Sequence, residues 1–376
     1  MRIGILTLPL HTNYGGILQA YALQTVLERM GHKVVVFDLP SQRIIPTFGK
    51  KLLSYSKRIV LKSLGKINRI FIEQYYNKTM PIIAQNIQPF IDENIHRKVM
   101  EKFSDLNPDE YDVIIVGSDQ IWRKKYYYLW LNKKIQNAYL HFTKGWNIKR
   151  ISYAASFGTD AWEYTSKETQ QCKAMLQNFD AVSVREVKGV NLCQKYFNIN
   201  AEHVLDPTML LNEEDYSKFF LKSDTPKSKG TLLNYILDEN DNIHDLIKDV
   251  AEQKCLTSFS VNNPFENDEL KPLNERIKPS VETWLRGFYD AEFVLTDSFH
   301  ACAFSILFKK QFAVVGNKER GLSRIESLLK CFGLGNRIVE NSAQVMRLPQ
   351  VDFDGVYSEL DKYRVKSCDF LKSVLS

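Results

Sequence analysis

The stretch FVLTDSFHA, residues 293–301, decides how this chain folds. The apolar run 293–295 predicts a buried strand, which stops at the polar residues 296–298. A helical pattern begins beyond them with His300 in its first turn, and the apolar run 312–315 predicts the next strand. Ligands of open α/β sheets bind at such carboxyl ends of strands. His300 is therefore either part of a ligand site or a structural residue beside a helix cap, and the stretch alone favours neither.

The composition is that of an ordinary globular protein. The 376 residues are enough for two domains, and 44% of them are hydrophobic and 25% charged. The net charge of +6 is small for a nucleic-acid-binding protein, so we expect no nucleic acid. This charge suits an anionic small substrate or an anionic membrane surface. The six cysteines lack metal-ligand spacing, so we expect reduced thiols and no metal site.

No stretch of the sequence predicts a membrane-spanning segment. The apolar start is broken at Pro9, before it reaches the length of a signal-peptide core. No apolar run approaches the roughly 18 residues that a span needs. We therefore expect a cytoplasmic protein, and peripheral attachment to the inner face of the cell membrane stays open.

Strand and helix patterns alternate along the chain, which predicts an α/β fold with mostly parallel sheets. We expect an N-terminal Rossmann-like domain over residues 1–212 and a C-terminal one over residues 231–350. The polar stretch 213–230 is the expected linker. Residues 351–376 predict an amphipathic helix that packs back on the N-terminal domain.

A basic stretch at about residues 41–108 differs from the rest of the first domain. Lysines and arginines alternate there with apolar residues, which predicts one or two amphipathic helices inserted into the domain. A solvated helical face and a contact with anionic lipid both fit this pattern.

Several predicted strands end in polar or glycine residues. The carboxyl ends of parallel strands gather at one edge of a sheet, so two domains facing each other would form a cleft lined by these residues. The glycines of the first such loop either admit an anion to a helix N-terminus or serve a tight turn. The candidate acceptor-binding or cleft residues are Asn13, Tyr14, Gly15, Gly16, Ser118, Gln120 and Ser156.

Charged residues stand at three of the same turns. Arg185 directly follows a predicted strand, and Arg320, Ser323 and Arg324 lie near the start of a later helix. A guanidinium binds a carboxylate or phosphate with two hydrogen bonds, although each arginine also has carboxylates nearby in the sequence. Asp119, at another strand end, is a candidate for a general base or for a group that orients a sugar hydroxyl.

Six segments resemble motifs of the polysaccharide pyruvyl transferase family, in the family's order. They are TNYGGILQA (12–20), VGSDQIW (116–122), YAASFG (153–158), SVRE (183–186), DPT (206–208) and TDSFH (296–300). The resemblance covers roughly residues 2–334. It implies two Rossmann-like domains facing a cleft, similar to the GT-B glycosyltransferase fold.

The resemblance also implies a reaction. Phosphoenolpyruvate is the expected donor, with no other cofactor. The expected acceptor is a sugar diol of a polysaccharide or of a lipid-linked oligosaccharide, as in capsular or exopolysaccharide biosynthesis. The product would be a cyclic pyruvate ketal, with release of phosphate. Two other functions stay open on this fold: a glycosyltransferase that uses a nucleotide sugar, and a non-catalytic protein that binds glycan precursors.

Site roles follow from the same resemblance. The family's histidine matches His300, the expected general acid and base together with Asp119, and its arginine after the middle strand matches Arg185. Many members carry an arginine two residues before the histidine, where this chain has Ser298. We therefore expect Arg320 or Arg324 to take over that anion contact. The expected donor-binding residues are Arg185, Arg320, Arg324, Ser298 and Ser323.

Overall fold

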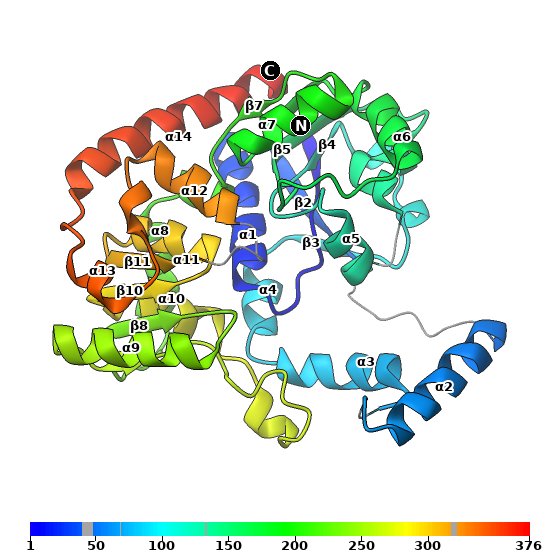
Figure 1. The fold of residues 1–376 in the computed structure, drawn as a ribbon. Coiled ribbons are helices and arrows are strands. Elements are labelled where there is room, and N and C mark those ends of the chain that lie inside the picture. Colours follow the sequence, from blue (N-terminus) through cyan, green and yellow to red (C-terminus); the bar gives the residue numbers. More distant parts are fainter. Residues whose placement is uncertain (40–47, 68, 132–133, 317–321) are drawn as a thin grey trace.

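The computed structural model describes residues 1–39, 48–67, 69–131, 134–316 and 322–376. In this part of the chain, two separate parallel sheets are each flanked by helices (Figure 1). The predicted α/β fold with two Rossmann-like domains is thereby confirmed. None of the helices described is long and apolar enough to cross a bilayer.

The first sheet belongs to the N-terminal half. Its described strands have the order β3-β2-β1-β4-β5-β6-β7 and run parallel. They are β1 (Arg2–Leu6), β2 (Lys33–Asp38), β3 (Arg97–Val99), β4 (Val113–Val116), β5 (Lys149–Ala155), β6 (Ala181–Val184) and β7 (Glu202–His203). The helices around it include α1 (Tyr14–Arg29), α4 (Gln88–Asn94), α5 (Lys124–Leu131), α6 (Ser166–Leu176) and α7 (Val187–Leu192). Every residue of the central strand β4 is buried, because helices cover both faces of a parallel sheet.

The second sheet includes the strand of the stretch FVLTDSFHA, residues 293–301, which continues into a helix. Its described strands have the order β12-β11-β10-β8-β9 and also run parallel. They are β8 (Leu232–Tyr235), β9 (Ser258–Phe259), β10 (Phe293–Thr296), β11 (Gln311–Val315) and β12 (Ile338–Val339). The helices of this half are α8 (Glu213–Lys222), α9 (Asp241–Lys254), α10 (Val281–Asp290), α11 (Phe299–Leu307), α12 (Leu322–Cys331) and α13 (Ser342–Met346). The sequence 293–307 thus forms a central strand, a short turn and a buried helix.

The stretch expected as a linker contains a packed helix. Helix α8 begins at a capping box formed by Asn212 and Asp215, and it buries Tyr216 and Phe220. Its exposed face carries the charges that make residues 213–230 look like a linker in the sequence. The basic stretch likewise holds more than inserted helices. After α2 (Phe48–Ser63), α3 (Ile72–Ile83) and α4, it returns to the first sheet as the edge strand β3.

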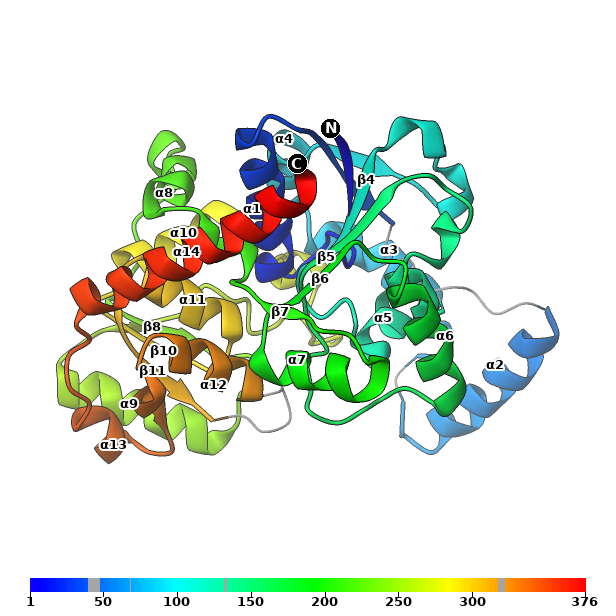
Figure 2. The same cartoon turned by 90° about the horizontal axis from the view of Figure 1, so that it is seen from above.

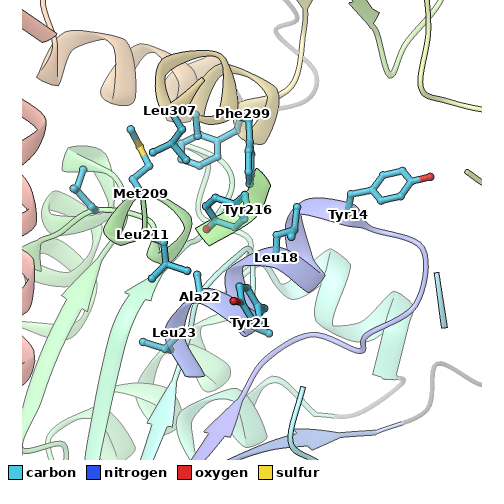
Figure 3. Packing of buried hydrophobic residues seen from close by; sticks show 14 of the residues in the cluster. Tyr14, Leu18, Tyr21, Ala22, Leu23, Met209, Leu211, Tyr216, Phe299 and Leu307 are labelled. Atoms are coloured by element: carbon cyan, nitrogen blue, oxygen red, sulfur yellow. The ribbon is translucent and has the colours of Figure 1, made fainter. Parts of the chain in front are cut away.

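The two halves share a continuous hydrophobic core. Figure 3 shows α1, the segment around Met209 and Tyr216, and α11 packed against one another. Helix α14 (Phe353–Leu375) runs along both halves (Figure 2). At one end the Tyr357 hydroxyl donates to the Leu307 carbonyl (2.6 Å), and at the other Lys149 donates to the Val374 carbonyl (3.0 Å). The carboxyl ends of the central strands are therefore held in a fixed relation across the boundary.

Candidate active site

A cavity of about 560 Å³ lies between the two halves, at the carboxyl ends of their strands. The first half contributes the loop between β1 and α1, the turn after β4, and Tyr126. The second half contributes the loops after β8 and β9, the turn between β10 and α11, and Arg324 of α12. The cleft expected between two facing domains is therefore present. Residues that are far apart in the sequence line it from both sides.

His300 occupies the first turn of α11 and lines this cavity. Its side chain is about one-tenth exposed, and its Nε2 lies 3.8 Å from Oδ2 of Asp206. Burial lowers the pKa of the His300 imidazole below its ordinary value, and the carboxylates of Asp206 and Asp119 offset this only in part. The nearby guanidinium groups of Arg185 and Arg324 lower the pKa further. The imidazole is therefore neutral at pH 7, with two carboxylates in place to stabilise it once it is protonated.

A buried ion-pair cluster lies beside His300. Arg185 Nη1 donates to Oδ2 of Asp206 (2.6 Å), and its Nη2 lies 3.5 Å from Oδ1 of Asp119. Burial alone would raise the pKa of the Asp206 carboxyl, but Arg185 and His300 outweigh burial and lower it. Oδ1 of Asp206 accepts hydrogen bonds from the backbone and hydroxyl of Thr208, which fixes the carboxylate. The cluster therefore holds Asp206 ionised beside the imidazole.

Arg185 is expected to bind the donor in the cleft, but its guanidinium lies beside the described cavity without lining it. Its guanidinium lies 4.3 Å from the centre of the Phe299 ring, and its side chain is 1% exposed. It is not among the residues that line the cavity in the described part of the chain. The donor contact predicted for Arg185 stays a prediction, and the structure adds two carboxylates with which this residue already pairs.

The first turn of α1 approaches the imidazole so closely that it requires glycine. A Cβ atom on Gly15 would lie 2.0 Å from Nδ1 of His300 and 2.3 Å from its Cγ. Two residues earlier, Asn13 donates from Nδ2 to Oδ2 of Asp119 (3.1 Å). One turn of the first half therefore positions both the histidine and the aspartate predicted to be catalytic.

Gly15→Ala tests this close approach. Alanine is favoured over glycine in a helix, so the helix itself should tolerate the change. The methyl group would displace His300, and we expect kcat to fall by up to about 10²-fold, as for other displacements of about 1 Å. Gly335→Ala is the matched control, since a Cβ there meets no atom within 4 Å. Equal kcat values for the two variants, at equal melting temperatures, would contradict the assignment.

Two cations among the described residues of the second half line the cavity. Arg324 is 9% exposed, and burial, assisted by Arg185, lowers the pKa of its guanidinium to about 10, so it remains charged at pH 7. Lys278 is 6% exposed, and its Nζ donates to Oε2 of Glu266 (2.5 Å). Buried cations at the wall of a cavity suit an anionic ligand. Arg320, the other arginine expected here, lies outside the described residues.

The remaining predicted residues divide into two sets. Those that line the cavity with His300 and Arg324 are Asn13, Gly15, Gly16, Asp119, Gln120 and Ser298. Tyr14, Ser118, Ser156 and Ser323 are buried but are not among the lining residues described. Tyr14 instead joins the two halves: its ring stacks on Trp284 (5.5 Å), and its hydroxyl donates to the Pro279 carbonyl (2.7 Å). Ser118 and Ser156 donate to the buried carboxylates of Asp206 and Glu186.

Three residues that line the cavity or face His300 were given no role in the site from the sequence. Lys278 lies in an irregular loop, and no strand end or motif marks it. His11 lines the cavity, and burial, together with Lys278, lowers the pKa of its imidazole to about 4. Asp206 belongs to the DPT motif (206–208), in which an aspartate before a proline is typical of a structural turn. One of its carboxylate oxygens does accept from the backbone of Thr208 in such a turn. Its second oxygen faces His300 only because of contacts across the domain boundary.

In the described part of the chain, no group of three or more His, Cys, Asp or Glu side chains is arranged to hold a metal ion.

The fold and the cavity define the class: an α/β protein with a cavity between two Rossmann-like halves. Residues 13–319 match the family model for polysaccharide pyruvyl transferase. Because this match covers most of the chain, the protein belongs to that enzyme family. None of the curated proteins compared with the chain matches it in sequence.

Three solved structures are similar to this chain in outline. The glycosyltransferase of kitacinnamycin has a TM-score of 0.48 at 10% identity, over 100% of this chain and 99% of that one. UDP-GlcNAc 2-epimerase from Neisseria meningitidis has a TM-score of 0.48 at 11% identity, over 100% and 99% of the two chains. A putative UDP-N-acetylglucosamine 2-epimerase from Listeria monocytogenes has a TM-score of 0.47 at 9% identity, over 98% and 90%.

Proposed function

We propose that this enzyme transfers the pyruvyl group of phosphoenolpyruvate to two hydroxyls of one sugar, forming a cyclic ketal and releasing phosphate. The observation that carries the proposal is the buried Arg324 guanidinium in the same cavity as His300. A donor with one carboxylate and one phosphate needs cationic contacts, and Arg324 and Lys278 supply them. The acceptor is a sugar diol of a polysaccharide or of a lipid-linked oligosaccharide.

The chemistry assigns two successive tasks to His300. The negative charges of the bound donor raise the pKa of the imidazole, which then takes up a proton. The imidazolium gives this proton to the methylene carbon, and C2 of the donor becomes an oxocarbenium-like centre. A sugar hydroxyl attacks C2, and neutral His300 accepts the hydroxyl proton. The carboxylates of Asp206 and Asp119 stabilise the charged form of the imidazole, and Arg185 holds both carboxylates beside it.

The second hydroxyl completes the reaction. The C2–O bond to phosphate breaks as the second sugar oxygen bonds to C2, which closes the ring. Of the two hydroxyl protons, one balances the proton added to the methyl carbon and the other leaves with phosphate. Asp119 lies on the cavity wall, where it orients the hydroxyls of the acceptor. The reaction changes no oxidation state overall, so it needs no redox cofactor.

An assay of phosphate release tests the proposal. The purified enzyme is mixed with phosphoenolpyruvate and a panel of galactose-, mannose- and glucose-type acceptors, including a lipid-linked galactoside. We expect release that depends on both substrates, and stabilisation against heat by phosphoenolpyruvate alone. Stabilisation by a nucleotide sugar, without any response to phosphoenolpyruvate, would instead favour a glycosyltransferase.

The pH dependence of donor binding provides a separate test. The pKa of His300 lies below its ordinary value in the free enzyme and rises in the donor complex, so donor binding takes up a proton between these two values. We expect the Kd for phosphoenolpyruvate to rise with pH across this window, by up to about tenfold per pH unit. Calorimetry at pH 6 to 8 measures this slope. His300→Gln is the control for titration of the donor, and an identical slope in both proteins would refute the coupling.

A further inference from the structure

Helix α2 exposes a ridge of large apolar side chains. Leu52, Leu53, Ile59, Val60 and Leu64 are 75%, 76%, 55%, 56% and 62% exposed, respectively. Single exposed apolar residues are common on protein surfaces, but a contiguous group marks a site of interaction. At 100° per residue, these five positions fall within one arc of the helix, extended by Leu64 just beyond its end.

The opposite side of α2 is already occupied. Arg58 donates to both oxygens of Glu73 on α3 (2.7 Å each), and the Tyr55 ring meets Phe71 edge-on at 4.9 Å. These contacts fix which side of α2 faces the protein. The ridge is therefore the outward face of an anchored helix. Figures 1 and 2 both show α2 at the periphery, beyond α3 and away from the two sheets.

The charge of this helix and of the three residues after it is concentrated and of one sign. Residues 48–66 carry six lysines and arginines and no aspartate or glutamate, which equals the net charge of +6 of the whole chain. No acidic residue occurs between Asp38 and Glu73. Lys57 and Lys62 are exposed and lie on either side of the apolar ridge. The surface thus combines apolar side chains at its centre with cations at its edges.

We propose that α2 docks on an anionic membrane surface. Its apolar ridge would enter the interface between headgroups and acyl chains, and its lysines would contact anionic headgroups, as in other basic amphipathic helices. A second copy of this chain would bring lysines of one α2 against lysines of the other. A nucleic acid would pair with the lysines but would leave the leucines uncovered. A membrane satisfies both parts of the surface.

The docking helix is linked to the cavity through α3. Helix α3 contacts the loop that forms one cavity wall, since Arg276 donates to the Tyr75 hydroxyl (2.6 Å) and the Lys278 amide donates to the Ile83 carbonyl (2.9 Å). Lys278 and Glu266 of this loop line the cavity. A docked α2 would therefore hold the cavity close to the bilayer, where a lipid-linked sugar is presented. The docking proposal rests on the surface of α2 alone, so it does not depend on which donor the enzyme uses.

Vesicle co-sedimentation of the full chain tests the docking. We expect binding to phosphatidylcholine vesicles that contain about 30% phosphatidylglycerol, and much weaker binding to pure phosphatidylcholine. The double variant L52E/V60E should bind the anionic vesicles at least about tenfold more weakly, since it places carboxylates in the ridge. The matched control is L221E/V365E, at residues that are 60% and 61% exposed on α8 and α14.

The cationic contribution is tested in the same assay. K57Q/K62Q should weaken binding about tenfold, and K222Q/K366Q, at exposed positions elsewhere, should not. Unchanged melting temperatures show that the variants fold. Absence of binding to the anionic vesicles, or equal binding by L52E/V60E and its control, would overturn the proposal. So would a dimer in solution that L52E/V60E dissociates while no vesicle binding occurs, because the occupant would then be a second copy.

Discussion

Replacing His300 with alanine is expected to lower kcat for phosphate release by about 10²–10⁴-fold, the usual contribution of a positioned acid or base. The side chain lines the cavity, is neutral in the free enzyme, and has the Asp206 carboxylate 3.8 Å from its Nε2. Alanine would remove the group that moves the proton but leave the cations on the cavity wall. The KM for phosphoenolpyruvate should therefore change much less than kcat, which steady-state kinetics measures.

The control for this prediction is another histidine. His141→Ala removes an exposed imidazole on the first half, and it should leave kcat unchanged. His300→Gln keeps a polar side chain of similar size and separates loss of proton transfer from loss of packing. If both His300 variants retain wild-type kcat while phosphate release still requires acceptor, then His300 is a wall residue and the proton is carried by another group.

The stretch at residues 293–301 shows how far sequence reasoning reached. The expected strand, turn and helix are present as β10 and α11, because apolar runs of this length specify a central strand and a buried helix locally. The helix cap is not formed by Ser298, since the Ser298 side chain makes no capping hydrogen bond with α11. The Asp297 carboxylate instead accepts the backbone N–H groups of Leu237 and Asp238, and so fixes the loop after β8.

The parts that sequence reasoning missed depend on contacts between the two halves. Asp206 follows the first sheet, and His300 belongs to the second; only the shared core brings their side chains within 3.8 Å. Nothing in the sequence around Gly15 indicates that the absence of a Cβ there makes room for the imidazole of His300, 285 positions later. Lys278 comes from a loop without regular structure. Periodicity and turn chemistry are local signals, so they predict the elements of this site but not their pairing.

Arg324→Gln is expected to reduce kcat/KM for phosphoenolpyruvate by about 10²–10³-fold, as for other preorganised anion contacts. The sequence left open which arginine replaces the one absent at Ser298. Both residues line the cavity in the structure, Ser298 from the turn before α11 and Arg324 from α12. Glutamine keeps much of the volume and removes the charge, whereas lysine keeps the charge and removes the bidentate geometry.

The two Arg324 variants together define what this side chain does. If it binds donor carboxylate or phosphate, KM should rise in both variants, and Arg324→Lys should recover part of the loss because a charge remains. If it only tunes His300, Arg324→Gln should raise the imidazole pKa, because this guanidinium lowers it, and KM should stay constant. Arg347→Gln removes an exposed arginine of the same half and is the matched control. An unchanged KM in Arg324→Gln would contradict the donor contact, and the charge that replaces the family's arginine would then have to come from another residue.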